Sequence, residues 1–350
     1  MHVPDGFINA PVSVAAGVAA AAAVAVSLRG ARRELDERTA PLAGLVAAFI
    51  FAVQMLNFPV AAGTSGHLLG GALAAILVGP YTGVLCVSVV LLMQGILFAD
   101  GGLTALGVNI TVMGVVTVVV AYALFRGLLK VLPRTRRSVT GAAFAGALIS
   151  VPASATAFTL LYAVGGTTDV ATGKVLTAMV GVHVLIGIGE AAITAATVGA
   201  VIAVRPDLVH GARGLTAPLK LRVGGELVDA PATAPEPVAA RSTGKVWATG
   251  LIAALALAGI VSSFASGSPD GLEKVAADQG IDAKADEYTH ATADSPLADY
   301  AIKDVANESL SVGLAGVIGV GATVAVGSGV FWVVRRRRTE EPAAAEPSAV

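Results

Sequence analysis

The first two residues of the chain, Met1 and His2, carry three nitrogen atoms that can chelate one metal ion. The terminal amine, the deprotonated amide of His2 and the Nδ1 of its ring close two small chelate rings. A planar nitrogen set of this kind suits Ni(II) or Cu(II) and can be adopted by Co(II). His67, in the stretch GTSGHLLGG, is a candidate for the fourth nitrogen. Because a histidine after Met1 carries little information alone, the rest of the chain must decide whether this is a metal site.

The composition is that of a polytopic membrane protein. The 350 residues are 55% hydrophobic and 13% charged, with a mean hydropathy of +0.78, whereas soluble domains carry roughly 25% charged residues. The net charge of −1 gives no indication of nucleic-acid binding. The single cysteine, Cys86, excludes an intrachain disulfide and a thiolate cluster. A metal site in this chain must therefore use nitrogen or oxygen ligands.

Apolar segments that cross, or nearly cross, about 30 Å of hydrocarbon define the predicted architecture. They lie at 8–28, 41–60, 67–79, 81–99, 105–132, 139–165, 174–204, 246–265 and 310–334. We predict an all-α integral membrane protein with about nine transmembrane helices. The third segment is short and flanked by glycines, which indicates a broken or tilted helix.

The positions of lysine and arginine predict the orientation. These residues gather at 29–38, 130–137, 205–222, 241–245 and 335–338. With an extracytoplasmic N-terminus, the predicted spans place all of these segments on the cytoplasmic side of the plasma membrane, as the positive-inside rule requires. The C-terminus is then cytoplasmic. No lysine or arginine precedes the first apolar run, so we expect a retained span rather than a signal peptide.

The segments fall into two modules. Residues 1–205 form the predicted seven-span module, and 246–338 form a two-span module. A cytoplasmic linker without a fixed fold, rich in proline and alanine, is expected at 206–245, and a disordered cytoplasmic tail at 339–350. The extracytoplasmic loop 267–309 of the second module holds ten acidic residues and three lysines.

Several polar side chains fall inside apolar segments, where an ionisable group costs roughly 2.5–3.5 kcal/mol on insertion scales. His183 and Glu190 lie on one helix face. They form either a metal or proton path or a hydrogen-bonded pair that locks helix packing. Asn57, Gln94 and Asn109 are predicted to support imidazoles or packing rather than to bind metal directly.

His67 follows a Gly/Ser-rich loop on the same side of the membrane as Met1. A loop enters the membrane-spanning part of a protein only where protein buries it. The N-terminal segment and the His67 loop are therefore expected to meet inside the helix bundle. Asp100, beside two glycines, is interpreted as part of an external turn. His290 is interpreted as a solvated residue of the acidic loop, and His210 as part of the cytoplasmic linker.

Four separated stretches, MHVPDGF, GTSGHLLGGALAAILVGP, LFADGGLTALGVNI and HVLIGIGEAAIT, resemble the CbiM/NikM family. These proteins are the substrate-binding membrane components of energy-coupling-factor transporters for cobalt and nickel. The resemblance covers about residues 1–205 and implies metal ligands at the Met1 amine, at the amide and imidazole of His2, and at His67. SFASGSPDGLEKVA, followed by SPLADYAI, resembles the PDGLE-type, NikN/CbiN-like partner, so the chain looks like a fusion of the two.

The resemblance implies a substrate-binding permease component of an ATP-driven importer, linked to cobalamin biosynthesis. Its transported ligand is Co(II) or Ni(II), it needs no cofactor, and its partners are a CbiQ/NikQ-like coupling subunit and CbiO/NikO-like ATPase subunits. The pattern GxxxxGK[ST] is absent from the sequence, so ATP hydrolysis is expected in a separate subunit. HExxH and GxSxG are absent too, which disfavours an enzyme.

The alternative is a stand-alone secondary divalent-metal transporter in which His183, Glu190 and Asp100 relay protons. The odd number of spans in the first module and the lack of an obvious inverted repeat disfavour this alternative.

Overall fold

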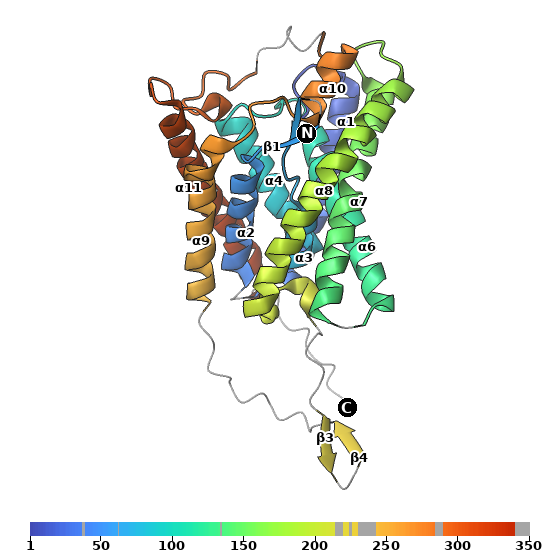
Figure 1. The fold of residues 1–350 in the computed structure, drawn as a ribbon, viewed down its shortest axis with the longest axis vertical. Coiled ribbons are helices and arrows are strands. Elements are labelled where there is room, and N and C mark those ends of the chain that lie inside the picture. The colour runs from blue at the N-terminus through green and yellow to red at the C-terminus, as the bar shows by residue number, and fades with distance from the viewer. Residues whose placement is uncertain are drawn as a thin grey trace, which may run out of the picture.

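A computed structural model describes residues 1–36, 39–61, 63–133, 135–213, 220–223, 226–229, 243–283 and 290–339. These residues form a bundle of upright helices, with the N-terminus tucked into one end of it (Figure 1). The helices of the first module are α1 (Ala10–Glu34), α2 (Thr39–Gln54), α3 (Gly71–Val78), α4 (Pro80–Leu97), α5 (Leu106–Asn109), α6 (Thr117–Val131), α7 (Arg136–Gly165) and α8 (Thr172–Val204). A π-helical stretch, Ile110–Val116, joins α5 to α6. The second module contains α9 (Gly244–Gly259), α10 (Gly271–Gln279) and α11 (Glu308–Thr339).

The all-α membrane fold is confirmed. Within the described residues, seven helical stretches are long and apolar enough to cross a bilayer, namely 10–34, 80–97, 106–131, 136–165, 172–204, 244–264 and 308–336. Helix α2 is equally apolar but only 16 residues long. With α3, these elements occupy all the predicted positions, and the chain is a multi-pass membrane protein.

The third predicted segment differs from the others because half of it is not a helix. Helix α3 has eight residues, which span about 12 Å at 1.5 Å per residue. The other half of the crossing is extended chain, Thr64–Gly70, and every residue of it is buried. Gly70, with φ +87°, begins α3; a side chain there would meet Ile50. The predicted span 67–79 is therefore helical only over Gly71–Val78.

The predicted span 41–60 also ends early, because α2 stops at Gln54 and the chain then forms a small hairpin. Strand β1 (Phe58–Ala61) pairs with β2 (Thr64–Gly66) in antiparallel register, Phe58 opposite Gly66. Pro59 favours this change because proline fits an edge strand and interrupts a helix.

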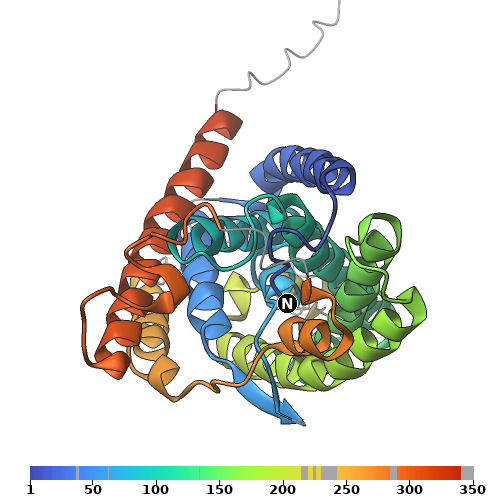
Figure 2. The same cartoon turned by 90° about the horizontal axis from the view of Figure 1, so that it is seen from above.

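Helix α3 lies at the centre of the bundle and contacts α2, α4, α6, α7 and α8. Seen from above, the other helices form a ring around the N-terminus (Figure 2). The second module completes this ring on one side, since α9 and α11 both pack against α2. Its short helix α10 packs against α8 and β2 at the end where the N-terminus lies.

Part of the predicted linker is ordered. Strands β3 (Lys220–Val223) and β4 (Glu226–Asp229) form an antiparallel hairpin, so the expectation of a linker without a fixed fold is wrong for these residues. Both strands contain valine and leucine, and the sequence Gly-Gly between them is one that favours a hairpin. The stretches 230–242 and 340–350, which include most of the Pro/Ala-rich sequence and the predicted tail, lie outside the described residues.

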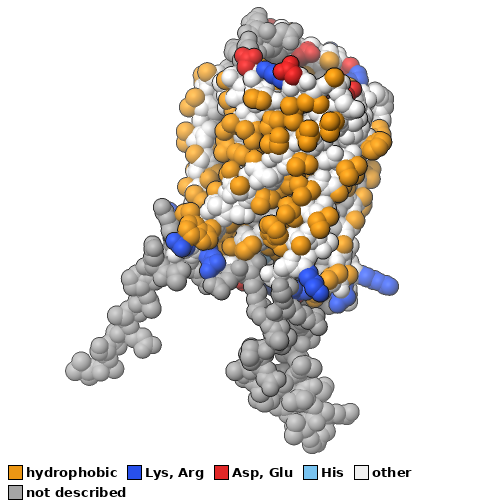
Figure 3. Space-filling model, turned by 90° about the vertical axis from the view of Figure 1, so that its left-hand side faces the viewer, with side chains coloured by type: hydrophobic (Ala, Val, Ile, Leu, Met, Phe, Trp, Pro, Cys, Tyr) orange, Lys and Arg blue, Asp and Glu red, His pale blue; other side chains and the backbone are white. Residues whose placement is uncertain are grey.

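The two ends of the bundle differ in charge. On the face drawn in Figure 3, lysine and arginine predominate at one end of the apolar surface, and aspartate and glutamate gather at the other end beside a few basic side chains. The N-terminus and α10 lie at the acidic end.

Candidate metal site

The N-terminal segment is buried in the bundle rather than lying on its surface. Met1 and Val3 are only 2% and 0% exposed. The Val3 amide donates to Asn109 Oδ1 (2.8 Å), and the Asn109 amide donates back to the Val3 carbonyl (3.1 Å). The Gly102 amide donates to the same carbonyl (2.9 Å). Hydrogen bonds from Asn109 and Gly102 thus fix the backbone next to Met1 and His2.

Asp5 anchors the next turn of this segment. Its Oδ1 accepts hydrogen bonds from the backbone N–H (2.8 Å) and the hydroxyl (2.5 Å) of Thr104. Gly102 permits the close approach, since a Cβ there would lie 2.3 Å from the Asp5 nitrogen. The VPDG and ADGGLT stretches therefore pack against each other, and hydrogen bonds from the second stretch hold the first in place.

His67 lies in the extended half-span, and its Nε2 faces the N-terminal amine. Its Nδ1 lies 3.0 Å from the carbonyl of Leu68. Because a carbonyl only accepts, Nδ1 carries the proton and Nε2 keeps its lone pair. Glu190 of α8 holds the following residues by accepting from the backbone N–H of Leu69 (2.7 Å) and Gly70 (3.1 Å).

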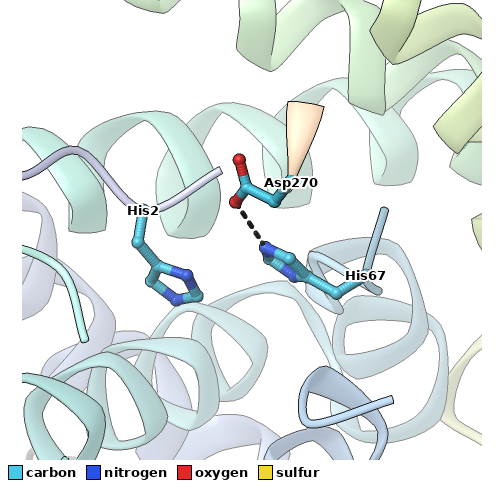
Figure 4. A group of neighbouring side chains, drawn as sticks. All are labelled: His2, His67 and Asp270. Carbon is cyan, nitrogen blue, oxygen red and sulfur yellow. Dashed lines mark ion pairs between the residues drawn. The ribbon is translucent and has the colours of Figure 1, made fainter. Parts of the chain in front are cut away.

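These elements bring the three predicted ligand residues together. The Met1 amine lies 2.5 Å from His67 Nε2, and the rings of His2 and His67 stack with centroids 5.0 Å apart. Asp270 joins them from the second module: its Oδ2 lies 2.6 Å from the amine and 3.4 Å from His67 Nε2 (Figure 4). One ligand atom each from His2, His67 and Asp270 falls within 4.8 Å of the others, an arrangement that can hold a metal ion.

Both ring nitrogens of His2 have polar neighbours. Nε2 lies 3.1 Å from Gln94 Oε1, and Nδ1 lies 3.2 Å from Asp100 Oδ1. Behind them, the Tyr300 hydroxyl donates to Asp100 Oδ2 (2.5 Å) and accepts from Gln94 Nε2 (2.9 Å). The second module thus reaches the site at two places, through Asp270 and through Tyr300.

The electrostatics of the site favour a positive charge beside a neutral His2 ring and an ionised Asp270. Burial lowers the pKa of His2 to about 4, outweighing the neighbouring Asp100 carboxylate. Burial alone would raise the pKa of Asp270, but the N-terminal ammonium and His67 together hold it well below its usual range. At neutral pH, Asp270 is therefore a carboxylate and His2 offers a lone pair.

Asp270 and Tyr300 are the residues that sequence reasoning missed. Asp270 is the aspartate of the PDGLE stretch and caps α10: its Oδ1 accepts from the N–H groups of Leu272 (2.7 Å) and Glu273 (2.9 Å). Its position before GLE is a recognisable cap signal, although the signal says nothing about the second oxygen, which faces the amine. Tyr300 lies in the stretch SPLADYAI, which contains no such local signal.

The other predicted polar residues have separate places. Asn109 supports the N-terminal segment. Asn57 contacts the second module through its backbone carbonyl, which accepts from the Ser266 N–H (2.7 Å). His183 and Glu190 are both buried in α8, but in the part of the chain that the structure describes no hydrogen bond joins them. His183 Nδ1 bonds to the carbonyl of Met179 (2.7 Å) instead.

Two interpretations of polar residues need correction. Asp100 is more than part of an external turn, because it contacts His2 and Tyr300. His290 is half-buried rather than solvated, and its Nε2 lies 3.1 Å from the Gly101 carbonyl. Both residues are held where the acidic loop closes over the N-terminal segment, a contact that composition does not reveal.

Glu190→Gln tests how the His67 segment is held. Glutamine offers one acceptor oxygen in place of two, which leaves a buried N–H of Leu69 or Gly70 without a partner. Hydrogen bonds to charged groups contribute about 1.5–3 kcal/mol, so we expect a lower unfolding temperature in detergent. The same substitution at Glu308, an exposed glutamate in the first turn of α11, is the matched control. Equal unfolding temperatures for the two variants would contradict this role of Glu190.

A comparison with known families identifies the family to which the chain belongs. Residues 2–208 match the family model described as the cobalt uptake substrate-specific transmembrane region, CbiM, and residues 244–336 match the PDGLE domain. The chain belongs to the CbiM family. It is a cobalt or nickel transport component of the CbiM/NikM type, fused to a PDGLE domain, and the predicted resemblance is confirmed.

Individual relatives agree with the family match. A putative metal transport protein of Haloquadratum walsbyi is 41% identical over 60% of this chain and 93% of its own. The putative fused nickel transport protein NikMN of Archaeoglobus fulgidus is 40% identical over 60% of this chain and 68% of its own. A solved transition metal transporter, 26% identical, superposes with a TM-score of 0.51 over 58% of this chain and 93% of that one. These relatives are transport proteins rather than enzymes.

Proposed function

We propose that this CbiM-family chain is the metal-capturing component of an ATP-driven energy-coupling-factor importer for cobalt or nickel. The ion is the transported substrate, bound by the Met1 amine, the amide nitrogen and Nδ1 of His2, and His67 Nε2. The observation that carries this proposal is the 2.5 Å approach of the Met1 amine to a lone-pair nitrogen of His67. Two nitrogens so close together and buried are arranged to share one cation.

The proposal includes an orientation and partners. The site lies at the acidic end of the bundle, so we place the N-terminus outside the cell and the basic end in the cytoplasm. The sequence lacks GxxxxGK[ST], which supports separate CbiO/NikO-like ATPases and a CbiQ/NikQ-like coupling subunit. We retain the predicted modules, 1–205 and 246–338, as the units of this assembly.

The test is metal loading of purified protein with its native N-terminus. We expect one Ni(II) or Co(II) per chain, and a planar four-nitrogen spectrum for nickel. In vesicles, uptake should require ATP and the partner subunits. Protein that takes up no metal would refute the site, while uptake by the purified chain alone would indicate a secondary transporter.

Asp270→Asn tests the carboxylate beside the amine. A carboxylate stabilises the metal-free ammonium as well as the metal, but a divalent ion carries twice the charge. Opposite unit charges 4 Å apart attract by about 4 kcal/mol at an effective dielectric constant of 20. Asparagine is as good a helix cap as aspartate, so we expect α10 to persist and metal affinity to fall at least about tenfold.

The matched control for this variant is Asp278→Asn, the same substitution in the same helix, at an exposed position paired with Lys274. Equilibrium dialysis against Ni(II) compares the two proteins. If both variants keep the wild-type affinity, Asp270 contributes nothing to metal binding.

A further inference from the structure

The second module approaches His2 by a route that does not involve Asp270. Tyr300 is half-buried, and its hydroxyl is hydrogen-bonded to Asp100 and Gln94, which both face the His2 ring. Its own ring stacks on Phe98 with centroids 4.7 Å apart. Tyr300 therefore contacts two neighbours of a proposed metal ligand.

The hydrogen bonds around Tyr300 determine which way the Gln94 amide faces. Tyr300 has one hydroxyl proton, and this proton is donated to Asp100 Oδ2 at 2.5 Å. The hydroxyl oxygen is then free to accept from the NH₂ group of Gln94 at 2.9 Å. With its nitrogen turned to Tyr300, Gln94 must present its carbonyl oxygen to His2, 3.1 Å from Nε2.

The Gln94 carbonyl in turn favours one tautomer of His2. A carbonyl accepts only, so this contact favours the ring proton on Nε2 and the lone pair on Nδ1. Asp100 Oδ1, 3.2 Å from Nδ1, competes for the same proton, and the hydrogen bond that Asp100 accepts from Tyr300 makes it a weaker competitor. Nδ1 is the nitrogen that closes a chelate ring with the backbone amide of the same residue, whereas Nε2 points away from that amide. Hydrogen bonds to the outer nitrogen of a ligating histidine commonly select its tautomer in this way.

The backbone at Tyr300 is itself unusual. Asp299 and Tyr300 have φ angles of +54° and +57°, in the left-handed region that a bulky side chain seldom adopts. Strained backbone of this kind persists where surrounding contacts fix it and is concentrated at functional sites. Here the Asp299 N–H donates to the Phe98 carbonyl (2.9 Å), which holds the tyrosine over Gln94 and Asp100.

We propose that Tyr300 is a positioning residue of the metal site, which orients Gln94 so that His2 offers Nδ1 to the ion. This inference rests on the proposed function, because it assumes that His2 binds the metal. The PDGLE-type module thereby controls the ring orientation of a ligand that belongs to the CbiM module.

Tyr300→Phe tests the proposal because it keeps the ring stacked on Phe98 and removes only the hydroxyl. Gln94 then loses the partner that orients its amide. Loss of such supporting contacts typically weakens metal binding about 10–100-fold, and we expect an effect of about tenfold on Ni(II) affinity. The visible absorption and circular dichroism bands of the bound nickel should also change, because His2 then binds through Nδ1 in only a fraction of the molecules. The matched control is Tyr162→Phe, whose hydroxyl bonds to Thr168 away from the site.

A double-mutant cycle separates positioning from general destabilisation. Gln94→Met removes the amide with little change of volume. If Tyr300 acts through Gln94, adding Tyr300→Phe to Gln94→Met should weaken nickel binding and shift its bands far less than Tyr300→Phe does alone. Fully additive effects, or a Tyr300→Phe protein with wild-type affinity and spectrum, would overturn the inference. Absence of nickel from wild-type and Tyr162→Phe protein would overturn the proposed function instead, and this inference with it.

Discussion

One residue added in front of Met1 is expected to abolish high-affinity metal binding while the helix bundle still inserts and folds. The extension converts the terminal amine into a peptide amide and moves the new amine about 3.8 Å along the chain. Met1 is 2% exposed and its nitrogen already contacts both His67 and Asp270. The enclosed site therefore has no room for a displaced amine to take the same position.

The measurement is nickel content per chain after size-exclusion chromatography, for proteins that carry one extra alanine at either end. The C-terminal addition is the control, because it lies far from the site in the sequence. We expect stoichiometric nickel in the control and near-complete loss in the N-terminal variant. Full metal uptake by the N-terminally extended protein would exclude the amine as a ligand.

His67→Ala is expected to have the second-largest effect. It removes the Nε2 that faces the amine and leaves a site with three nitrogen ligands from Met1 and His2. Each factor of ten in affinity corresponds to about 1.4 kcal/mol. Loss of one of the four nitrogen ligands is expected to lower the metal affinity by several factors of ten. We expect metal to be lost to a competing chelator and high-affinity uptake to cease.

His210→Ala is the informative control for His67→Ala. His210 begins a short 3-10 turn (His210–Ala212) beyond the far end of α8 and packs near Tyr122. It is the same residue type and half-buried, but remote from the N-terminus. Chelator challenge of nickel-loaded protein compares the two variants at matched expression. If the two proteins release nickel equally fast, His67 has only a structural role.

Hydrophobic segments and short motifs were enough to predict the helices and the meeting of the N-terminus with His67. Local patterns carry this information: long apolar runs for spans, and glycines around GTSGHLLGG for the broken one. The early end of α2 at Gln54 was harder to predict, because the apolar sequence continues beyond that residue.

The contributions of Asp270 and Tyr300 could not be predicted because both residues lie in a loop and contact partners that are distant in the sequence. Asp270 is separated from Met1 by 269 positions, and Tyr300 from Gln94 by 206. Loop residues carry no periodicity that indicates which side chain faces which. In the sequence, Asp100 resembles a surface turn, and only the folded chain shows that the acidic loop closes over it.

Because Asp270 and Tyr300 belong to the same chain as His2 and His67, their docking is an intramolecular reaction. Tethered partners meet at effective concentrations of about millimolar, whatever the abundance of the protein in the membrane. The matched regions 2–208 and 244–336 are joined by residues 209–243, so every copy of the proposed metal site is synthesised with its own Asp270 and its own Tyr300. Fusion thus fixes the stoichiometry of the two parts at one to one, and a shortage of the second module can never leave a site open.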